Sequence, residues 1–330
     1  MSVPPLIVLN ARRAWRWQWN QLMNGLAPAD PHGNYVRPES DRKSKIILDE
    51  ADLSNRSPNQ FPHLIVGRSC PWAHRTWLVF ELNNLSTHLK LLPAQVDQKG
   101  GRWKFNPPFL KCTSLLSLYQ KCGVSPTNRA TVPALIDPGK GNEQKPILIS
   151  NESAQIVQAL NSLSFTETSI NLYPEGIQKE IDNWLRMLHT NVNNGVYCCG
   201  FSRTQKAYER ASNKLFDTLA KVEYQLNQEG PWLCGEQLTL ADIYLFPTLI
   251  RWELIYMPLF RCSQTPLWTF PKIWEWRQQF LAIPNVSKTC DHIAWQEDYF
   301  GALFPLNPGN IIPLGPDLLK ITNSTPPAML

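Results

Sequence analysis

The residue best suited to chemistry in this sequence is Cys70, which is followed directly by Pro71. Proline fits the first position of a helix because its missing N–H group has no partner there, so Pro71 predicts a helix with Cys70 as its N-cap. A sulfur at an N-cap faces unpaired backbone N–H groups and the positive end of the helix dipole, and both favour the thiolate. The pair therefore predicts a nucleophilic cysteine.

The segment around Cys70 predicts a monothiol site. Ala73 stands where a dithiol oxidoreductase carries its resolving cysteine, so release of a mixed disulfide from Cys70 requires an external thiol. His74 and Arg75 follow one turn along the predicted helix, and either can add positive charge near the sulfur. The plainer alternatives are that Cys70 is a small capping residue in a core and that His74 is a hydrogen-bonded structural side chain.

Two further segments fit a thiol ligand with a peptide backbone. Pro133 precedes a predicted strand, and in a thioredoxin-like domain such a proline is cis and lies opposite the cysteine. The backbone of Val132 is then free to pair with a peptide-like ligand. Glu152 and Ser153 lie at a strand-to-helix turn, where the carboxylate suits an ammonium and the hydroxyl and amides suit a carboxylate. The alternative for this turn is an ordinary N-cap.

Together, the three segments predict a glutathione site. Cys70 would meet the sulfur, Val132 the cysteinyl unit, and Glu152 and Ser153 the γ-glutamyl end. Catalysis at such a site needs glutathione as a co-substrate and no metal. No Cys-x-x-Cys pair or Cys/His cluster at zinc spacing is present among the eight cysteines.

The elements that position these residues are predicted to form two domains. Short apolar runs alternate with amphipathic ones from residue 61, which predicts a β-α-β opening, a loop-rich insertion over 97–129, and then two strands and a helix. From residue 173 the pattern is helical, and Thr239 to Asp242 form a capping box before one helix. The predicted boundaries are a mostly irregular arm (1–60), a glutathione-binding domain (61–165), a helical domain (173–304) and a Pro-rich tail (305–330). The tryptophans of the arm, Trp15, Trp17 and Trp19, are candidates to anchor it on the body.

Composition excludes several classes of function. The chain has 330 residues, 43% of them hydrophobic, which is enough for one large core or two ordinary ones without a disulfide or metal staple. The net charge of +5 is thinly spread, which argues against a nucleic-acid partner. No apolar run is long enough to cross a membrane, and the N-terminal residues lack the pattern of a secretory signal. We expect a cytoplasmic protein with mostly free thiols and no membrane partner.

The sequence resembles a known family over most of its length from about Gly33 onward. It looks like a glutathione transferase of the glutathionyl-hydroquinone reductase (Xi) class, relatives of the omega class with a catalytic cysteine in a Cys-Pro-Trp-Ala-His-Arg motif, here residues 70–75. The resemblance implies an α/β thioredoxin-like N-terminal domain followed by an all-α glutathione-transferase C-terminal domain. Further matching segments lie at residues 193–201, 238–251, 291–293 and 307–316.

The resemblance also implies roles for individual residues. By it, Cys70 is the nucleophile, and Trp103 and Arg129 join Val132, Pro133, Glu152 and Ser153 around glutathione. Three tyrosines of the family's aromatic substrate pocket fall on Tyr197, Tyr256 and Tyr299. A homodimer assembled through the helical domain is implied as well. The chain departs from the family at residues 252–255, Trp-Glu-Leu-Ile, where an Asp-Pro is usual, and its arm retains only residues 33–37 of the expected approach segment.

The activity implied is reduction of glutathionyl-hydroquinones to hydroquinones through a mixed disulfide between Cys70 and glutathione. One alternative is an omega-like thioltransferase or dehydroascorbate reductase that uses the same cysteine. Another is a non-catalytic binding module with a transferase-like fold. The motif residues quoted above argue against the non-catalytic alternative.

Overall fold

A computed structural model describes residues 3–38, 46–97, 101–139, 145–166, 169–318 and 320 of the chain. Its first half is built on a mixed six-stranded sheet of order β4-β3-β2-β1-β5-β6. The strands are β1 (His63–Gly67), β2 (Lys90–Asp97), β3 (Arg102–Phe109), β4 (Cys112–Ser114), β5 (Ala134–Asp137) and β6 (Ile147–Ser150). Only β1 and β2 pair in parallel, with Ile65 opposite Leu92, and the remaining pairs are antiparallel.

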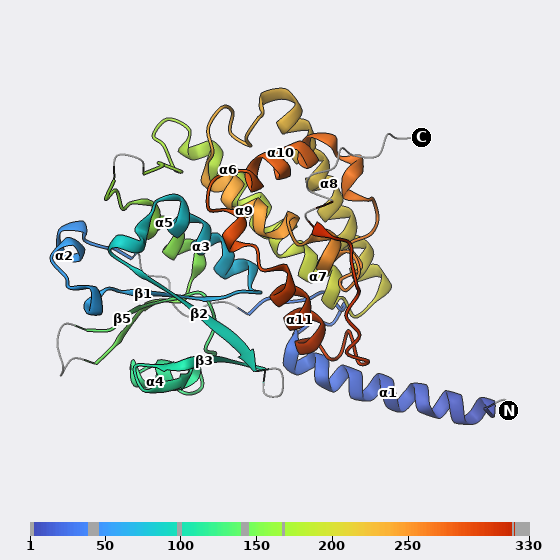
Figure 1. The fold of residues 1–330 in the computed structure, drawn as a ribbon. Helices are drawn as coiled ribbons and strands as arrows, with labels where there is room; N and C mark the ends of the chain where they lie inside the picture. The colour runs from blue at the N-terminus through green and yellow to red at the C-terminus, as the bar shows by residue number, and fades with distance from the viewer. Residues whose placement is uncertain are drawn as a thin grey trace.

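Helices cover both faces of this sheet. Figure 1 shows α3 (Pro71–Leu82) and α5 (Ser153–Asn161) together on one face and α4 (Leu115–Lys121) on the other. In the central strand β1, Leu64 to Gly67 are buried and the first residue, His63, is partly exposed, as expected for a strand covered on both faces. The predicted β-α-β opening and the later β-β-α unit are confirmed.

The predicted loop-rich insertion contains more structure than expected. Strands β3 and β4 form a hairpin that extends the sheet, and its turn is made by Leu110 and Lys111, both with positive φ (48° and 64°). Two residues with positive φ match the twist of a tight hairpin, but this turn is usually marked by Asn or Gly. Because Leu-Lys carries no such mark, the sequence did not predict the hairpin.

The second half is helical. Its helices are α6 (Gln178–Leu188), α7 (Gly195–Phe201), α8 (Gln205–Glu229), α9 (Leu240–Leu249), α10 (Pro271–Leu281) and α11 (His292–Ala302), with π-helical turns η3 (His189–Asn193) and η4 (Trp252–Tyr256). The predicted capping box before α9 is confirmed, because Asp242 Oδ2 accepts from the Thr239 backbone N–H at 3.0 Å. Helix α11 was not predicted.

The prediction of a mostly irregular N-terminal arm is wrong. Helix α1 (Pro5–Leu26) fills much of it, and a short helix α2 (Glu50–Ser54) follows. Figure 1 shows α1 running outward from the rest of the protein, and Met23 is its one buried residue. The prolines at residues 4 and 5 stand at the start of α1, where a helix tolerates them, so they do not indicate irregular chain.

Of the three candidate anchors on α1, only Trp19 holds the helix to the body. Its indole N–H donates to the Pro305 carbonyl at 3.0 Å, and the Arg203 guanidinium lies 5.4 Å from its ring. Trp15 and Trp17 are 45% and 65% exposed. The tail from residue 305 has no long helix where it is described, and the rest of it lies outside the described residues.

The cysteines agree with the expectation of mostly free thiols. All eight lie among the described residues, and all are free. Within the same residues, no group of three His, Cys, Asp or Glu side chains is placed to hold a metal ion. None of the described helices is both long and apolar enough to span a bilayer.

Candidate active site

The predicted site residues converge on one cavity of about 1150 Å³ between the sheet domain and the helical domain. All of them line it except Tyr256. The lining residues among them are Cys70, Trp103, Arg129, Val132, Pro133, Glu152, Ser153, Tyr197 and Tyr299. They come from β3, from the loop before β5, from the N-terminal ends of α3 and α5, and from α7 and α11. The site therefore requires both domains.

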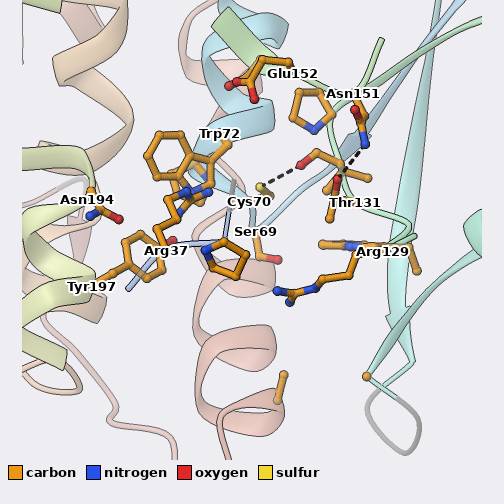
Figure 2. Close-up of a pocket in the computed structure, with 18 of the residues that line it drawn as sticks. Arg37, Ser69, Cys70, Trp72, Arg129, Thr131, Asn151, Glu152, Asn194 and Tyr197 are labelled. Atoms are coloured by element: carbon orange, nitrogen blue, oxygen red, sulfur yellow. Dashed lines mark hydrogen bonds between the residues drawn. The ribbon is translucent and has the colours of Figure 1, made fainter. Parts of the chain in front are cut away.

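Cys70 occupies the predicted N-cap of α3, with Pro71 as the first helical residue. Its thiol lies 3.6 Å from the carbonyl oxygen of Val132 and donates to it, the contact drawn as a dashed line in Figure 2. The Val132–Pro133 peptide bond is cis, as predicted. The predicted nucleophile and the backbone segment predicted to receive a peptide-like ligand are thus in direct contact.

The electrostatics of Cys70 differ from the simple expectation. Burial raises the pKa of the thiol above its usual value. The backbone N–H groups of Ala73 and Trp72 and the charges of Arg251 and Arg37 act in the opposite direction. The helix N-terminus therefore favours the thiolate as predicted, but burial outweighs it in the protein without a ligand.

The turn before α5 is both an N-cap and a cavity wall. Glu152 is the N-cap residue, and its carboxylate accepts from the Ala154 backbone N–H at 3.5 Å. The Glu152 backbone N–H in turn donates to the Ser150 hydroxyl at 3.0 Å, and Asn151 donates to the Thr131 hydroxyl at 3.4 Å. Figure 2 shows Glu152 at the end of the cavity beyond Cys70. Glu152 lines the cavity, so its carboxylate can meet a cation there.

Trp103 and Arg129 also line the cavity. Trp103 lies on β3, opposite Val96 of β2, and its ring covers Gly67 at the end of β1. A Cβ atom at Gly67 would lie only 2.3 Å from this ring, so glycine is required for Trp103 to adopt its position. Arg129 projects from the loop before Thr131 (Figure 2). The sequence did not single out Gly67.

The three predicted tyrosines form one cluster. The hydroxyl of Tyr299 is 2.7 Å from that of Tyr197 and 3.3 Å from that of Tyr256. Burial raises the pKa of all three phenols, so they are protonated near neutral pH. Tyr197 and Tyr299 line the cavity, whereas Tyr256 is fully buried behind them. The cluster can therefore present phenol O–H groups to a ligand beside Cys70.

Comparison with known proteins agrees with this arrangement. Residues 69–163 match the model of the glutathione S-transferase N-terminal domain, and residues 205–279 match that of the C-terminal domain. The chain belongs to the glutathione S-transferase family. Its α/β thioredoxin-like domain followed by an all-helical domain is the fold of that family, so the predicted fold class is confirmed.

Several relatives of the chain are named for an enzymatic activity. The chain is 32% identical to the glutathionyl-hydroquinone reductase PcpF of Sphingobium chlorophenolicum, over 92% of this chain and 94% of that protein. It is also 32% identical to the glutathionyl-hydroquinone reductase YqjG of Escherichia coli, with 77% and 79% covered.

Solved structures resemble this transferase as well. The glutathione S-transferase Xi from Phanerochaete chrysosporium has a TM-score of 0.77 and 30% identity, covering 87% of this chain and 94% of its own. The glutathione-bound structure of YqjG from Escherichia coli has a TM-score of 0.70 and 31% identity, covering 78% and 86%. These relatives support use of glutathione by this family member.

Arg37 also lines the cavity, although the sequence assigned it no role. Arg37 lies after α1, and its guanidinium is 3.9 Å from the ring centroid of Trp72 and 6.0 Å from that of Tyr197 (Figure 2). It lies within the segment 33–37 that the chain shares with the Xi class, and this was the available signal. The arm thus contributes a cation to the site.

The departure from the family at residues 252–255 lies away from the cavity. None of these four residues lines it, and the Glu253 carboxylate forms a buried ion pair with Arg277 at 2.8 Å. The change from the usual Asp-Pro is therefore accommodated in the core of the helical domain.

Proposed function

We propose that this protein is a glutathionyl-hydroquinone reductase in which Cys70 is the nucleophile. The observation that carries the proposal is the position of the Cys70 thiol, between the Val132 backbone and the Tyr197–Tyr299 cluster in one cavity. A thiol site of this family beside paired phenols suits a substrate with a sulfur and aromatic hydroxyl groups.

In the first step, the Cys70 thiolate attacks the sulfur of the glutathionyl-hydroquinone. An S–S bond forms between Cys70 and glutathione, the bond from sulfur to the aromatic carbon breaks, and that carbon takes up a proton. In the second step, a glutathione thiolate attacks the mixed disulfide, which restores the Cys70 thiolate and releases glutathione disulfide. The hydroquinone and glutathione disulfide are the products, and the kinetics are expected to be ping-pong.

The surrounding residues have separate roles in this proposal. The Val132 backbone, Pro133, Glu152 and Ser153 hold glutathione with Trp103 and Arg129. Tyr197 and Tyr299 serve the hydroquinone, and Tyr256 supports Tyr299 from behind through their hydroxyls. The Val132 carbonyl accepts from the Cys70 thiol in the ligand-free protein. A ligand amide that binds this carbonyl would take the thiol's acceptor away, which favours the thiolate at the moment of binding.

The experiment that tests the function is mass spectrometry of the intact protein and its peptides. After exposure to glutathionyl-menadiol without a reducing thiol, we expect one glutathione adduct per chain, located on Cys70, with release of free menadiol. An adduct on another cysteine, or none, would contradict the assignment. Assays with dehydroascorbate and hydroxyethyl disulfide separate the omega-like alternative, for which these substrates would be turned over faster than the glutathionyl-hydroquinone.

The tyrosine cluster gives a prediction specific to the aromatic substrate. Replacing Tyr197 or Tyr299 with phenylalanine removes one hydroxyl next to the cavity, and each variant is expected to lose about tenfold in kcat/KM for a glutathionyl-hydroquinone, equivalent to one hydrogen bond of about 1.4 kcal/mol. Reduction of hydroxyethyl disulfide should change less than threefold. Tyr224→Phe is the control, since Tyr224 is exposed on α8 away from the cavity. An equal loss with both substrates would contradict the role of the cluster.

We also propose that the protein acts as a homodimer in the cytoplasm. Assembly through the helical domain follows from the family resemblance. Eight free cysteines and a glutathione-dependent thiol reaction suit a reducing compartment.

A further inference from the structure

We propose that Arg251 is a positioning residue for the nucleophile, a buried positive charge behind the active-site loop that stabilises the Cys70 thiolate. The inference rests on the proposed role of Cys70 as nucleophile. It assigns the cation near the sulfur to the helical domain, whereas the sequence pointed to His74 or Arg75 of the sheet domain.

Arg251 lies directly behind the loop that carries the nucleophile. It follows α9, and its guanidinium donates to the Arg68 carbonyl, two residues before Cys70, at 3.5 Å. The indole N–H of Trp295 from α11 donates to the same carbonyl at 3.0 Å, and the guanidinium lies 3.9 Å from the centroid of that indole. The aromatic ring and the carbonyl therefore fix the guanidinium against the active-site loop.

The hydrogen bonds around His74 determine its protonation. The Thr289 hydroxyl donates its proton to the Val286 carbonyl at 2.7 Å, so its oxygen accepts from His74 Nε2 at 2.7 Å. His74 Nδ1 lies 2.7 Å from Arg251 Nη1, which always carries its proton, and so Nδ1 must be the acceptor. His74 is thus the neutral Nε2–H tautomer. Burial, and then the charge of Arg251, hold the pKa of His74 well below its usual value.

His74 therefore orients the charge of Arg251 and carries none itself. A protonated His74 would point an N–H group at the guanidinium and place two cations in contact. Arg75, the other candidate, stacks between the rings of Trp72 and Tyr244, at 4.5 and 4.2 Å from their centroids. Arg251, which adds the positive charge behind the sulfur, is distant from Cys70 in the sequence.

Arg251 has no carboxylate partner among the described residues. Its side chain is fully buried, and its remaining hydrogen bond goes to the Pro247 carbonyl at 2.9 Å. Arg277, equally buried in the same domain, is bound by both oxygens of Glu253, at 3.0 and 2.8 Å. A buried cation is costly unless a negative charge compensates it, and a Cys70 thiolate would supply that charge.

Other charged and titratable groups also face Cys70 and Arg251. The charge of Arg37, from the arm, also lowers the pKa of Cys70, but by less than the charge of Arg251 does. Glu152 and Asp298 line the same cavity as possible opposing charges. The titratable groups influenced by Arg251, apart from Cys70, are His74, Tyr256, Cys290 and Tyr299, and burial keeps each of them neutral near pH 7. Among Cys70 and these four residues, Cys70 is the one that the proposed reaction requires as an anion.

The test is the pH dependence of Cys70 alkylation by iodoacetamide, followed at the level of the Cys70 peptide because seven other cysteines are present. In Arg251→Met the midpoint is expected to rise by about one pH unit, so that alkylation below the midpoint slows about tenfold. Arg251→Lys keeps the charge and should shift the midpoint by less than half as much. A folded Arg251→Met protein with an unchanged midpoint would overturn the proposal.

The matched control is Arg277→Met combined with Glu253→Gln. It removes a buried arginine from the same domain without leaving an unpaired carboxylate, and it should leave the alkylation midpoint in place. A shift as large as that of Arg251→Met would mean that loss of domain packing, and not the charge, moves the thiol.

A measurement on the unaltered protein remains if Arg251→Met does not fold. Nitrogen-15 NMR of the histidine side chains, assigned with His74→Gln, should show His74 as the neutral Nε2–H tautomer throughout the range from pH 8 to pH 5. An imidazolium at neutral pH would overturn the proposal. Neither experiment uses a quinone, so a shifted midpoint without reductase activity would support Arg251 while refuting the proposed function.

Discussion

Replacing Cys70 with alanine is expected to lower kcat/KM for a glutathionyl-hydroquinone by at least about a thousandfold while the fold is kept. The loss is large because Cys70 is the proposed nucleophile that forms the covalent intermediate, and no other group in the cavity can replace it. The other cysteines do not line this cavity, so none is positioned to take over the attack. The measurement is steady-state release of hydroquinone in the presence of glutathione, with circular dichroism and thermal unfolding as checks on the fold.

Cys70→Ser separates the need for sulfur from the need for an N-cap. Serine keeps a polar N-cap for α3 but is a far weaker nucleophile, so it should also lose the reductase activity. Cys122→Ala and Cys290→Ala are the matched controls, since both cysteines are half-buried elsewhere, and each should keep most of the activity. Turnover retained in Cys70→Ala would refute the nucleophile, and a loss of the fold in Cys70→Ser would show a structural role instead.

The parts of the site that could be predicted from the sequence are those fixed by local structure. Cys70 at the start of α3 follows from Pro71 and the apolar strand before it, and Glu152 at the start of α5 follows from a strand-to-helix turn. In each case, the residue type and its immediate neighbours determine the backbone conformation. These predictions were correct because capping and proline geometry act within a few residues.

The parts that could not be predicted depend on contacts between distant segments. The cation–π stacking of Arg37 on Trp72 joins the arm to α3, and the contact of Arg251 with His74 spans 177 residues. Gly67 matters because the ring of Trp103 comes to rest on it from another strand. No periodicity or short motif records such contacts, because each partner alone fits an ordinary surface or core position.

Elements with little buried surface were also missed. Helix α1 has one buried residue and begins at Pro5, where a helix tolerates proline, so neither burial nor the local proline content indicates it. Tyr299 was assigned from the family resemblance, while the helix that carries it, α11, has no clear apolar stripe of its own. The position of α11 is set by packing against η4 and by its N-cap residue Asp291, whose carboxylate accepts from the Ala294 backbone N–H at 3.0 Å.

Glu152→Gln is expected to weaken glutathione binding by about 10- to 100-fold. The variant replaces the carboxylate proposed to hold the γ-glutamyl ammonium with a neutral amide, and a hydrogen bond to a charged group contributes about 1.5–3 kcal/mol. Ser153→Ala, which removes one hydroxyl proposed to meet the neighbouring carboxylate, should lose about tenfold. Titration calorimetry with glutathione on the Cys70→Ala protein measures both changes without turnover.

The N-cap role of Glu152 has to be separated from ligand binding, because its carboxylate also accepts from the Ala154 backbone N–H. Loss of a cap lowers stability by about 1 kcal/mol but does not by itself lower affinity. Asp49→Ala is the control for loss of a cap: Asp49 caps α2 through the Ala51 backbone N–H at 2.9 Å and does not line the cavity. If Glu152→Gln loses stability as Asp49→Ala does but binds glutathione unchanged, the turn before α5 is only an N-cap, and the γ-glutamyl end must bind elsewhere.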